Sequence, residues 1–340
     1  MILSSDKPTV SIVIPVHNGG EKFRKCLMSI SENTTLPKEI IVVADGESDG
    51  SWRMAEDFNT EILRIPTPGG PARARNLGAQ KAKGDILFFV DADVTIAKNA
   101  LDLVINAFQN DPDLTAVFGS YDDDPFETNF LSQYKNLFHH YVHQTSSENA
   151  STFWGACGAI RREVFLEMGG FDEGYRRPSI EDIELGYRLK KSGYRIRLLK
   201  DLKVKHLKHW GIISLLKADF FYRALPWTKL ILSEGKFLDD LNISISNRVS
   251  IISVYLLLLA LGGAFFIPWF LIPALLLIVS LLVFNRGLYS FFKNKRGIYF
   301  ASKTIPWHWF YFFYSGLGFL IGFADYHIKR IANFGSRNKK

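Results

Sequence analysis

The sequence feature that most constrains this chain is a long uncharged stretch in its C-terminal part. From Val249 to Asn285 there is no Asp, Glu, Lys or Arg. An α-helix of about 20 apolar residues crosses a bilayer, so the stretch has room for two spans, which we place at 249–267 and 269–285. Pro268 lies between them and favours a turn there, because proline breaks a continuing helix.

A third apolar stretch, 304–324, contains His308 and no other acidic or basic side chain. We therefore predict a membrane region of about three transmembrane spans over 248–326, followed by a basic tail at 327–340. Aromatic, leucine and basic residues are mixed in 210–247, which predicts helices that lie in the membrane interface. The residues before this segment have the mixed composition of a globular domain.

Much of the formal net charge of +7 lies next to the apolar stretches. The loop before the third stretch has cations and no acids: Arg286, Lys293, Lys295, Arg296 and Lys303. Such loops mark the cytoplasmic side and attract anionic lipids, so we expect a membrane partner and no nucleic acid. Met1–Pro8 is polar and lacks a signal-peptide pattern, which predicts a cytoplasmic domain on a multi-pass cell-membrane protein. Three spans would place the tail outside, against the positive-inside trend, so a re-entrant third stretch is the alternative.

Within 1–209, short apolar runs alternate with helical patterns. The strand-like runs are 9–15, 39–44, 62–65 and 85–90. Strands that alternate with helices predict an α/β fold with a doubly wound, mainly parallel sheet. Ligands bind such sheets at the carboxyl ends of the strands, so the residues that follow each strand are the first candidates for a site.

Polar turns follow these runs. His17 follows the first strand, Asp45 the second, and Asp91 and Asp93 the fourth, while Arg75 lies in a glycine-rich turn after the third. Carboxylates suit ribose hydroxyls, a base N–H or a hard metal ion, and arginine suits phosphate oxygens. Together the turns predict a pocket for a nucleoside diphosphate.

The Asp91-Ala92-Asp93 motif predicts a metal site. In an extended segment, side chains two residues apart point the same way, so the two carboxylates could share one ligand. Mg²⁺ and Mn²⁺ favour one or two carboxylates with substrate phosphate oxygens, and such an ion would neutralise a leaving diphosphate. The alternative is an acidic turn that caps the next helix, and the position after a buried strand favours the metal.

Glu181 and Asp182 begin a helical pattern in the second half of the domain. Acids favour helix N-termini, so capping by Ser179 or Glu181 is the simpler interpretation. An inverting sugar transfer, however, requires a carboxylate base to deprotonate the acceptor hydroxyl. This pair is the best placed to supply that base, and both residues are catalytic candidates.

Three further positions have both a structural and a functional interpretation. His206, after a strand-like run, is either a metal ligand or a structural histidine. Trp154 and Gly155 lie either beside the acceptor, where an aromatic face can stack on a sugar, or in the core. Cys26 and Cys157 are too few for a disulfide framework or a zinc site, which predicts that both are small core residues.

The chain resembles the family 2 glycosyltransferases, which have the A-type nucleotide-sugar fold. The resemblance covers about Val10 to Leu199, with the family's motifs in their usual order. The matching segments are VSIVIPVHNGG, IIVVADGESDGS, GGPARARNLGAQKAKGDILFFVDADV, FWGACGAIRREVFLEMGGFDE and SIEDIELGYRLKKSGYRI.

The resemblance implies a role for each main candidate. Asp45 would contact the nucleotide base, Asp91 the ribose and Asp93 the metal. Asp182 would be the catalytic base, and Arg75 would help to hold the nucleotide. The predicted site also includes Pro15, His17, Ala92 and, as a further metal ligand, His206.

Two departures from the family's pattern bear on specificity. The second strand usually ends in two acids, and here the first is Ala44, which leaves the choice between a uridine and a guanosine donor open. The Gln-X-X-Arg-Trp signature of processive synthases is absent, and the corresponding region reads HLKHW at 206–210. Its absence favours the transfer of single sugars.

We therefore predict an inverting glycosyltransferase that uses Mn²⁺ or Mg²⁺ and a nucleotide-diphosphate sugar. The aromatic, basic segment at 210–236 favours a membrane acceptor, either a polyprenyl phosphate or a lipid-linked glycan. A soluble acceptor and a non-catalytic membrane scaffold with the same fold are the alternatives. The Gly-X-Gly-X-X-Gly and Gly-Lys-Ser/Thr motifs of Rossmann dehydrogenases and P-loop NTPases are absent.

Overall fold

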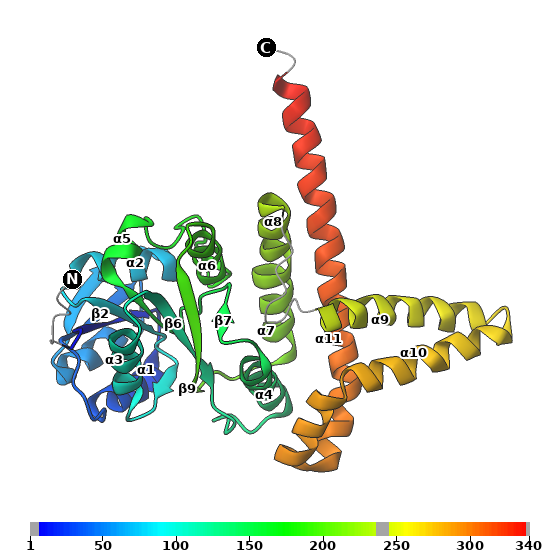
Figure 1. The fold of residues 1–340 in the computed structure, drawn as a ribbon, viewed down its shortest axis with the longest axis horizontal. Coiled ribbons are helices and arrows are strands. Elements are labelled where there is room, and N and C mark those ends of the chain that lie inside the picture. Colours follow the sequence, from blue (N-terminus) through cyan, green and yellow to red (C-terminus); the bar gives the residue numbers. More distant parts are fainter. Residues whose placement is uncertain (1–6, 236–244, 338–340) are drawn as a thin grey trace. The chain divides into compact units, whose positions relative to one another are not determined.

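The computed structural model describes residues 7–235 and 245–337. The chain divides into two compact units, Met1–His209 and Trp210–Lys340, and each is described by itself (Figure 1). The division falls shortly after the last strand of the first unit, which ends at His206.

The first unit is built around one mixed sheet, in which the described strands are ordered β3-β2-β1-β4-β8-β6-β9-β5, with β7 paired to β9. The pairs β1–β2, β1–β4, β2–β3 and β6–β9 are parallel, whereas β5, β7 and β8 run antiparallel to their neighbours. The strands are β1 (Val10–Val16), β2 (Glu39–Asp45), β3 (Glu61–Ile65), β4 (Ile86–Val90), β5 (Val94–Ile96), β6 (Leu114–Tyr121), β7 (Asn149–Ala150), β8 (Cys157–Arg161) and β9 (Arg195–His206). The predicted α/β class with a mainly parallel sheet is confirmed.

Helices cover both faces of this sheet. They are α1 (Gly20–Ser31), η1 (Ser51–Phe58), α2 (Pro71–Lys81), α3 (Ala100–Asn110), α4 (Phe130–Thr145), α5 (Arg162–Glu167) and α6 (Glu181–Lys191). On β1, Ile12 and Ile14 belong to one buried cluster with side chains of α1 and α3, while Val13 belongs to another with side chains of α2 and α6. Alternate strand residues face opposite sides, so β1 is apolar along its whole length because both of its faces are covered.

The short strand β5 was not expected from the sequence. Its three residues pair antiparallel with β9, with Val94 opposite His206, and α3 begins only at Ala100. Three residues are too few to display a strand or helix period. The pairing brings Asp93, the residue before β5, next to the end of β9.

The second unit is helical. Its described helices are α7 (Ile212–Lys217), η2 (Ala218–Ala224), α8 (Leu225–Glu234), α9 (Ile245–Ala264), η4 (Pro268–Phe270), α10 (Leu271–Phe284) and α11 (Arg286–Arg337). α11 is interrupted at Gly297, whose φ is 82°. Leu257 of α9, Leu281 of α10 and Phe312 of α11 share one buried apolar cluster. Figure 1 shows α9 and α10, in yellow, side by side as a helical hairpin.

This hairpin exposes many of its apolar side chains. Leu259 of α9 and Leu276 of α10 are exposed, and Phe265 and Phe266 between the two helices are 90% and 88% exposed. Contiguous apolar surface is rare on soluble monomers, so the hairpin suits an apolar surrounding.

The helices differ from the prediction of three spans. By length and composition, α9 is long and apolar enough to cross a membrane, and among the other described residues Pro268–Phe284 and Arg286–Ile331 pass this test only as a pair bent by 61°. α10, which contains most of the predicted span 269–285, has 14 residues, fewer than the roughly 20 that a span needs. The predicted span 304–324 lies within α11, and its Trp, Tyr and His residues make it less apolar than α9.

The predicted interfacial segment, 210–247, is helical from Ile212 to Glu234. Residues 236–244 of that segment lie outside the described residues. The same holds for 338–340 of the predicted basic tail, and the residues before them continue α11.

Candidate active site

The carboxyl ends of β1, β2 and β4 meet at one edge of the sheet, where Asp45 organises the glycine-rich turn. Its carboxylate accepts hydrogen bonds from the backbone N–H groups of Gly69 (2.8 Å) and Gly70 (2.7 Å), and His17 Nδ1 donates to its carbonyl oxygen (2.7 Å). Gly70 has a φ of 93°, and a Cβ there would lie 2.5 Å from the Arg176 carbonyl oxygen, so the turn requires glycine. The predicted contact of Asp45 with a nucleotide base would use the acceptor capacity that remains on its carboxylate.

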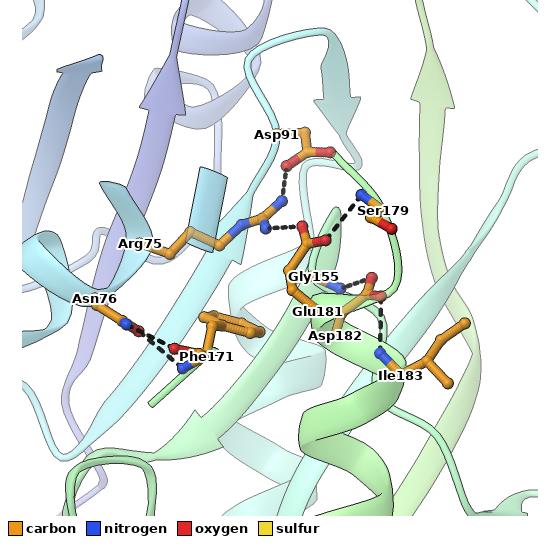
Figure 2. A network of polar contacts seen from close by, with 9 residues as sticks. All are labelled: Arg75, Asn76, Asp91, Gly155, Phe171, Ser179, Glu181, Asp182 and Ile183. Carbon is orange, nitrogen blue, oxygen red and sulfur yellow. Dashed lines mark hydrogen bonds and ion pairs between the residues drawn. The ribbon is translucent and has the colours of Figure 1, made fainter. Parts of the chain in front are cut away.

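A buried arginine connects this edge to α6, as Figure 2 shows. Arg75 Nη2 donates to Asp91 Oδ1 at 2.6 Å, and Arg75 Nη1 donates to Glu181 Oε1 at 2.9 Å. Arg75 and Glu181 are each 4% exposed. We call Arg75, Asp91, Glu181 and Asp182 the arginine cluster. The two terminal nitrogens of Arg75 thus point at carboxylates, which differs from the phosphate contact predicted for this turn.

Asp182, like Asp91, is partly exposed. Its carboxylate accepts hydrogen bonds from the backbone N–H groups of Gly155 (2.9 Å) and Ile183 (2.8 Å) (Figure 2). Burial, and after it the charge of Glu181, raise the pKa of Asp182 to about 7, against the opposing effects of the Gly155 N–H and Arg75. A carboxylate with a pKa near neutrality can act as a general base at physiological pH.

The acids at the start of α6 do not cap this helix in the way considered from the sequence. The N-cap residue is Ile180, whose side chain makes no capping hydrogen bond. Glu181 Oε2 accepts from the backbone N–H of Ser179 at 2.9 Å, while its other oxygen meets Arg75. Two acids of the first turn of α6, Glu181 and Asp182, therefore belong to the arginine cluster, while Glu184 pairs with Arg188.

A second cluster forms where β5 pairs with β9. Asp93 Oδ2 lies 3.6 Å from His206 Nε2, and the Tyr121 ring stacks on the imidazole, with ring centroids 4.8 Å apart and an interplanar angle of 14°. We call Asp93, His206 and Tyr121 the histidine cluster. Burial works to raise the pKa of Asp93, but His206, and after it Lys208 and Lys22, lower that pKa to about 2. The carboxylate of Asp93 is therefore ionised at neutral pH.

Asp91 and Asp93 do not share one direction, which corrects the reasoning from an extended segment. The backbone after β4 forms a turn, in which the Val94 N–H donates to the Asp91 carbonyl oxygen at 3.2 Å. Asp91 turns toward Arg75, and Asp93 turns toward His206. Burial raises the pKa of Asp91, and the neighbouring charge of Arg75 opposes that shift. The Asp-X-Asp motif thus contributes one carboxylate to each cluster.

The histidine cluster fits a divalent metal ion whose coordination a bound substrate would complete. Within residues 7–235 and 245–337, no three His, Cys, Asp or Glu side chains form a group that could hold a metal by themselves. Asp93 and His206 supply one carboxylate and one imidazole close enough to reach a common ion. Carboxylates suit Mn²⁺ and Mg²⁺, and the imidazole favours a transition metal. Diphosphate oxygens and water would supply the other ligands.

Trp154 and Gly155 lie at the join between the two clusters. The Trp154 ring packs edge-on against Tyr121, with centroids 4.8 Å apart, and 5.4 Å from the His143 ring. It is partly buried and contacts both core clusters of the unit. A Cβ on Gly155 would lie 3.2 Å from Arg75 Cζ, so glycine leaves room for the guanidinium. The packing of Trp154 is structural, and its contact with an acceptor remains a prediction.

Two features of the site were missed in the sequence. Tyr121 ends an apolar strand, and nothing local distinguishes it from a core residue. Asn18 has a φ of 52°, and its Oδ1 accepts from the N–H groups of Ser48 (2.8 Å) and Asp49 (3.2 Å). Asn18 thereby joins the turns after β1 and β2, and the preference of asparagine for positive φ is the one signal that could have marked it.

Comparisons with known proteins agree with this arrangement. The family model described as Glycosyl transferase family 2 matches residues 11–169, and a second, described as the N-terminal domain of galactosyltransferase, matches residues 137–210. Together they include all members of both clusters. The part of the chain that these models match is therefore similar to glycosyltransferase family 2, as its motifs indicated.

Individual relatives share part of the chain. It is 26% identical over 253 residues to the uncharacterized glycosyltransferase YfnE of Bacillus subtilis, covering 58% of this chain and 64% of that protein. It is 24% identical over 207 residues to the glucosyl-dolichyl phosphate glucuronosyltransferase of Haloferax volcanii, covering 55% of this chain and 64% of that protein. The chain thus spans less than two thirds of the length of these relatives.

One solved structure resembles most of the chain. The mannosyltransferase PcManGT from Pyrobaculum calidifontis, in complex with GDP-Man and Mn²⁺, has a TM-score of 0.55 and 18% sequence identity, covering 93% of this chain and 88% of that chain. At this identity the similarity shows a common fold, the A-type fold expected from the sequence.

Proposed function

We propose that the protein transfers a single sugar, with inversion, from a nucleotide-diphosphate sugar to a hydroxyl of a lipid-linked acceptor. The observation that carries this proposal is the Asp182 carboxylate. It is partly exposed, has a pKa of about 7, and belongs to the same cluster as Asp91. A scaffold without catalysis would have no need for a carboxylate raised toward neutrality, whereas a general base does.

The donor half of the reaction would use the edge of the sheet. Asp45 holds the glycine-rich turn, and Asp91 would accept hydrogen bonds from the ribose hydroxyls. Asp93 and His206 would hold a divalent ion, which, when bound, supplies positive charge for the leaving diphosphate. Because Ala44 replaces one of the acids usual at the end of this strand, both uridine and guanosine donors remain to be tried.

The acceptor half would use Asp182. Its carboxylate takes the proton from the acceptor hydroxyl while the hydroxyl oxygen attacks the anomeric carbon. The bond from that carbon to the diphosphate oxygen breaks on the opposite face, so the configuration inverts. The N–H groups of Gly155 and Ile183 orient the carboxylate, and the ring of Trp154 would lie beside the acceptor sugar.

The pKa of Asp182 also separates the two lipid acceptors considered from the sequence. A phosphate monoester, with a second pKa of about 6, is ionised near neutral pH and needs no base. A sugar hydroxyl does need one, so Asp182 favours a lipid-linked sugar over a polyprenyl phosphate. The relative named a glucosyl-dolichyl phosphate glucuronosyltransferase supports this choice, because its name contains a lipid-linked sugar.

We further propose that the second unit attaches the enzyme to the cell membrane. The length and apolar character of α9, and the exposed apolar side chains of the α9–α10 hairpin, support this. A hairpin returns the chain to the side from which it entered. The exposed cations Arg286, Lys293 and Lys295 follow the hairpin, which favours the cytoplasmic side for them and for the residues before α9.

An in vitro transfer assay tests the catalytic proposal. Thermal-shift screening of nucleotide sugars with Mn²⁺ would first identify the donor. The purified full chain would then receive that donor with either a prenyl-linked sugar or a prenyl phosphate of the same chain length. We expect mass spectrometry to detect glycosylation of the prenyl-linked sugar, and NMR to detect an inverted anomeric bond. Product from the prenyl phosphate alone, or a retained configuration, would contradict the proposal.

Cysteine labelling tests the membrane proposal, and the natural Cys26 and Cys157 give little background because both are buried. Lys293→Cys should react with an impermeant maleimide only after the cells are permeabilised. Phe266→Cys, in the turn of the hairpin, should not react with the same reagent when the reagent is applied from the cytoplasmic side. Labelling of Lys293→Cys in intact cells would place the cations outside and refute the orientation.

A further inference from the structure

The contacts of Arg75 indicate a role other than nucleotide binding, which is the role that the resemblance implies. Its two terminal nitrogens contact Asp91 and Glu181, at 2.6 Å and 2.9 Å. Its Nε is buried and has no hydrogen-bond partner among the described residues. The guanidinium is therefore held by two carboxylates that lie 16 and 106 positions away in the sequence.

These two carboxylates belong to different halves of the site. Asp91 follows β4, at the edge where the donor would bind. Glu181 begins α6 and is covalently next to Asp182, the base in the proposed function. Arg75 lies between them and is the one cation within the arginine cluster, while the cluster contains three carboxylates (Figure 2). Without this cation, three acids would lie close together, and Glu181 among them is 4% exposed.

We propose that Arg75 is a positioning residue for the catalytic base: by bridging Asp91 and Glu181 it fixes the start of α6 and keeps Asp182 ionised where the acceptor must be deprotonated. This inference rests on the proposed function. It differs from a nucleotide-binding role, in which the guanidinium would be directed mainly at the donor. In Arg75 both terminal nitrogens are directed at the carboxylates.

The charges around Asp182 determine how the variants should behave. Glu181 repels the Asp182 carboxylate and Arg75 attracts it. Two further titratable groups interact with this cluster through their charges: Asp93 with Asp91, and Tyr175 with Glu184, Asp172 and Glu181. Removal of Arg75 should therefore make Asp182 harder to ionise, and removal of the Glu181 charge should make it easier.

The test is the pH profile of kcat at saturating donor and metal. In the wild type the rate should fall below about pH 7, because protonated Asp182 cannot act as a base. In Arg75→Gln we expect this acid limb to move to higher pH by about one unit or more. In Glu181→Gln it should move to lower pH. The double variant Arg75→Gln/Glu181→Gln should lie between the two, because a cation and an anion are lost together.

Two further variants separate charge from geometry. Arg75→Lys keeps the cation but not the planar two-point bridge, so its acid limb should stay near that of the wild type while kcat falls. Lys81→Gln removes one positive charge from an exposed position on the same helix, and should leave the limb where it is. If Arg75→Gln does not fold, Glu181→Gln and Arg75→Lys still measure the two effects.

The outcomes distinguish this inference from the proposed function. If the wild type shows no acid limb, or Asp182→Asn keeps it, the proposed base is wrong. If the wild type and Asp182→Asn behave as proposed, but folded Arg75→Gln raises the donor KM without moving the limb, Arg75 is a nucleotide ligand and the positioning role is refuted.

Discussion

The two polar clusters at the edge of the sheet differ in how the negative charge of their carboxylates is balanced. In the arginine cluster, the protein supplies its own cation, and Arg75 lies between carboxylates of different segments. In the histidine cluster, Asp93 lies beside an imidazole, on which the Tyr121 ring stacks. The pKa of Asp182 is raised to about 7, and that of Asp93 is lowered to about 2.

This difference indicates that the two clusters have different functions. A carboxylate that stays ionised, beside an imidazole, suits a metal ion and a diphosphate. A carboxylate that takes up a proton near neutral pH suits acid–base chemistry. Since Asp91 and Asp93 are two residues apart, the same turn connects the two tasks.

The largest effect is expected from Asp93→Ala. Loss of this carboxylate removes one of the two protein ligands for the metal, so kcat should fall on the order of 10³-fold or more. Binding of Mn²⁺, measured by electron paramagnetic resonance in the presence of nucleoside diphosphate, should weaken in parallel. Asp113→Ala, at an exposed position, is the matched control. Unchanged Mn²⁺ binding in Asp93→Ala would show that the histidine cluster does not hold the metal.

Asp182→Asn should separate donor binding from transfer. The amide cannot accept the proton, so kcat should fall about 10²–10⁴-fold, while the affinity for the donor, measured by calorimetry, stays near that of the wild type. Asp201→Asn, exposed in β9, serves as the control. Transfer at the wild-type rate would show that the base lies elsewhere.

Tyr121→Leu should weaken the histidine cluster through His206. The ring that stacks on the imidazole is lost, so His206 is less well oriented, and the affinity for Mn²⁺ should fall about 10-fold to 100-fold. Tyr121→Phe keeps the stacked ring and should bind Mn²⁺ almost as the wild type does. Equal losses in the two variants would mean that the hydroxyl, not the stacking, is what matters.

The smallest effect concerns stability, and its sign should differ between the clusters. The folded-state pKa of Asp182 lies above the unfolded value of about 3.9, so its contribution to stability is present below pH 4 and lost as the pH rises through 7. The folded-state pKa of Asp93 lies below the unfolded value, so the contribution of Asp93 to stability is present above pH 4 and lost as the pH falls through 2. At pH 8 without metal, Asp182→Asn should stabilise and Asp93→Asn should destabilise the fold.

After allowance for partial exposure, each change is about 1–2 kcal/mol. Thermal unfolding of the detergent-solubilised full chain in EDTA measures both variants against the wild type. Near pH 4 the advantage of Asp182→Asn should disappear. Shifts of the same sign at pH 8 would contradict the opposite electrostatics of the two clusters.

Local sequence patterns were sufficient for strands β1 to β4 and for the candidate residues. The runs that become β1, β2 and β4 are apolar along their length because both faces of a parallel sheet are covered. Their order along the chain places the polar turns at one edge, which is why Asp45, Asp91 and Asp93 could be singled out. The apolar helices of the second unit were marked by their lack of charge, although their lengths differ from the three spans expected.

What each candidate contacts was decided only by the tertiary structure. Asp93 meets His206 because β5 pairs with β9. Arg75 meets Glu181 across the side of the sheet where α2 and α6 share one core cluster. The turn after β4 sends Asp91 and Asp93 in different directions, which a rule for extended chain cannot anticipate. Hydrophobic periodicity records which face of a segment is buried, whereas the partner of a polar side chain depends on segments far away in the sequence. The sequence by itself thus determined the fold class and the chemical groups available, and the packing of distant segments assigned each group its neighbour.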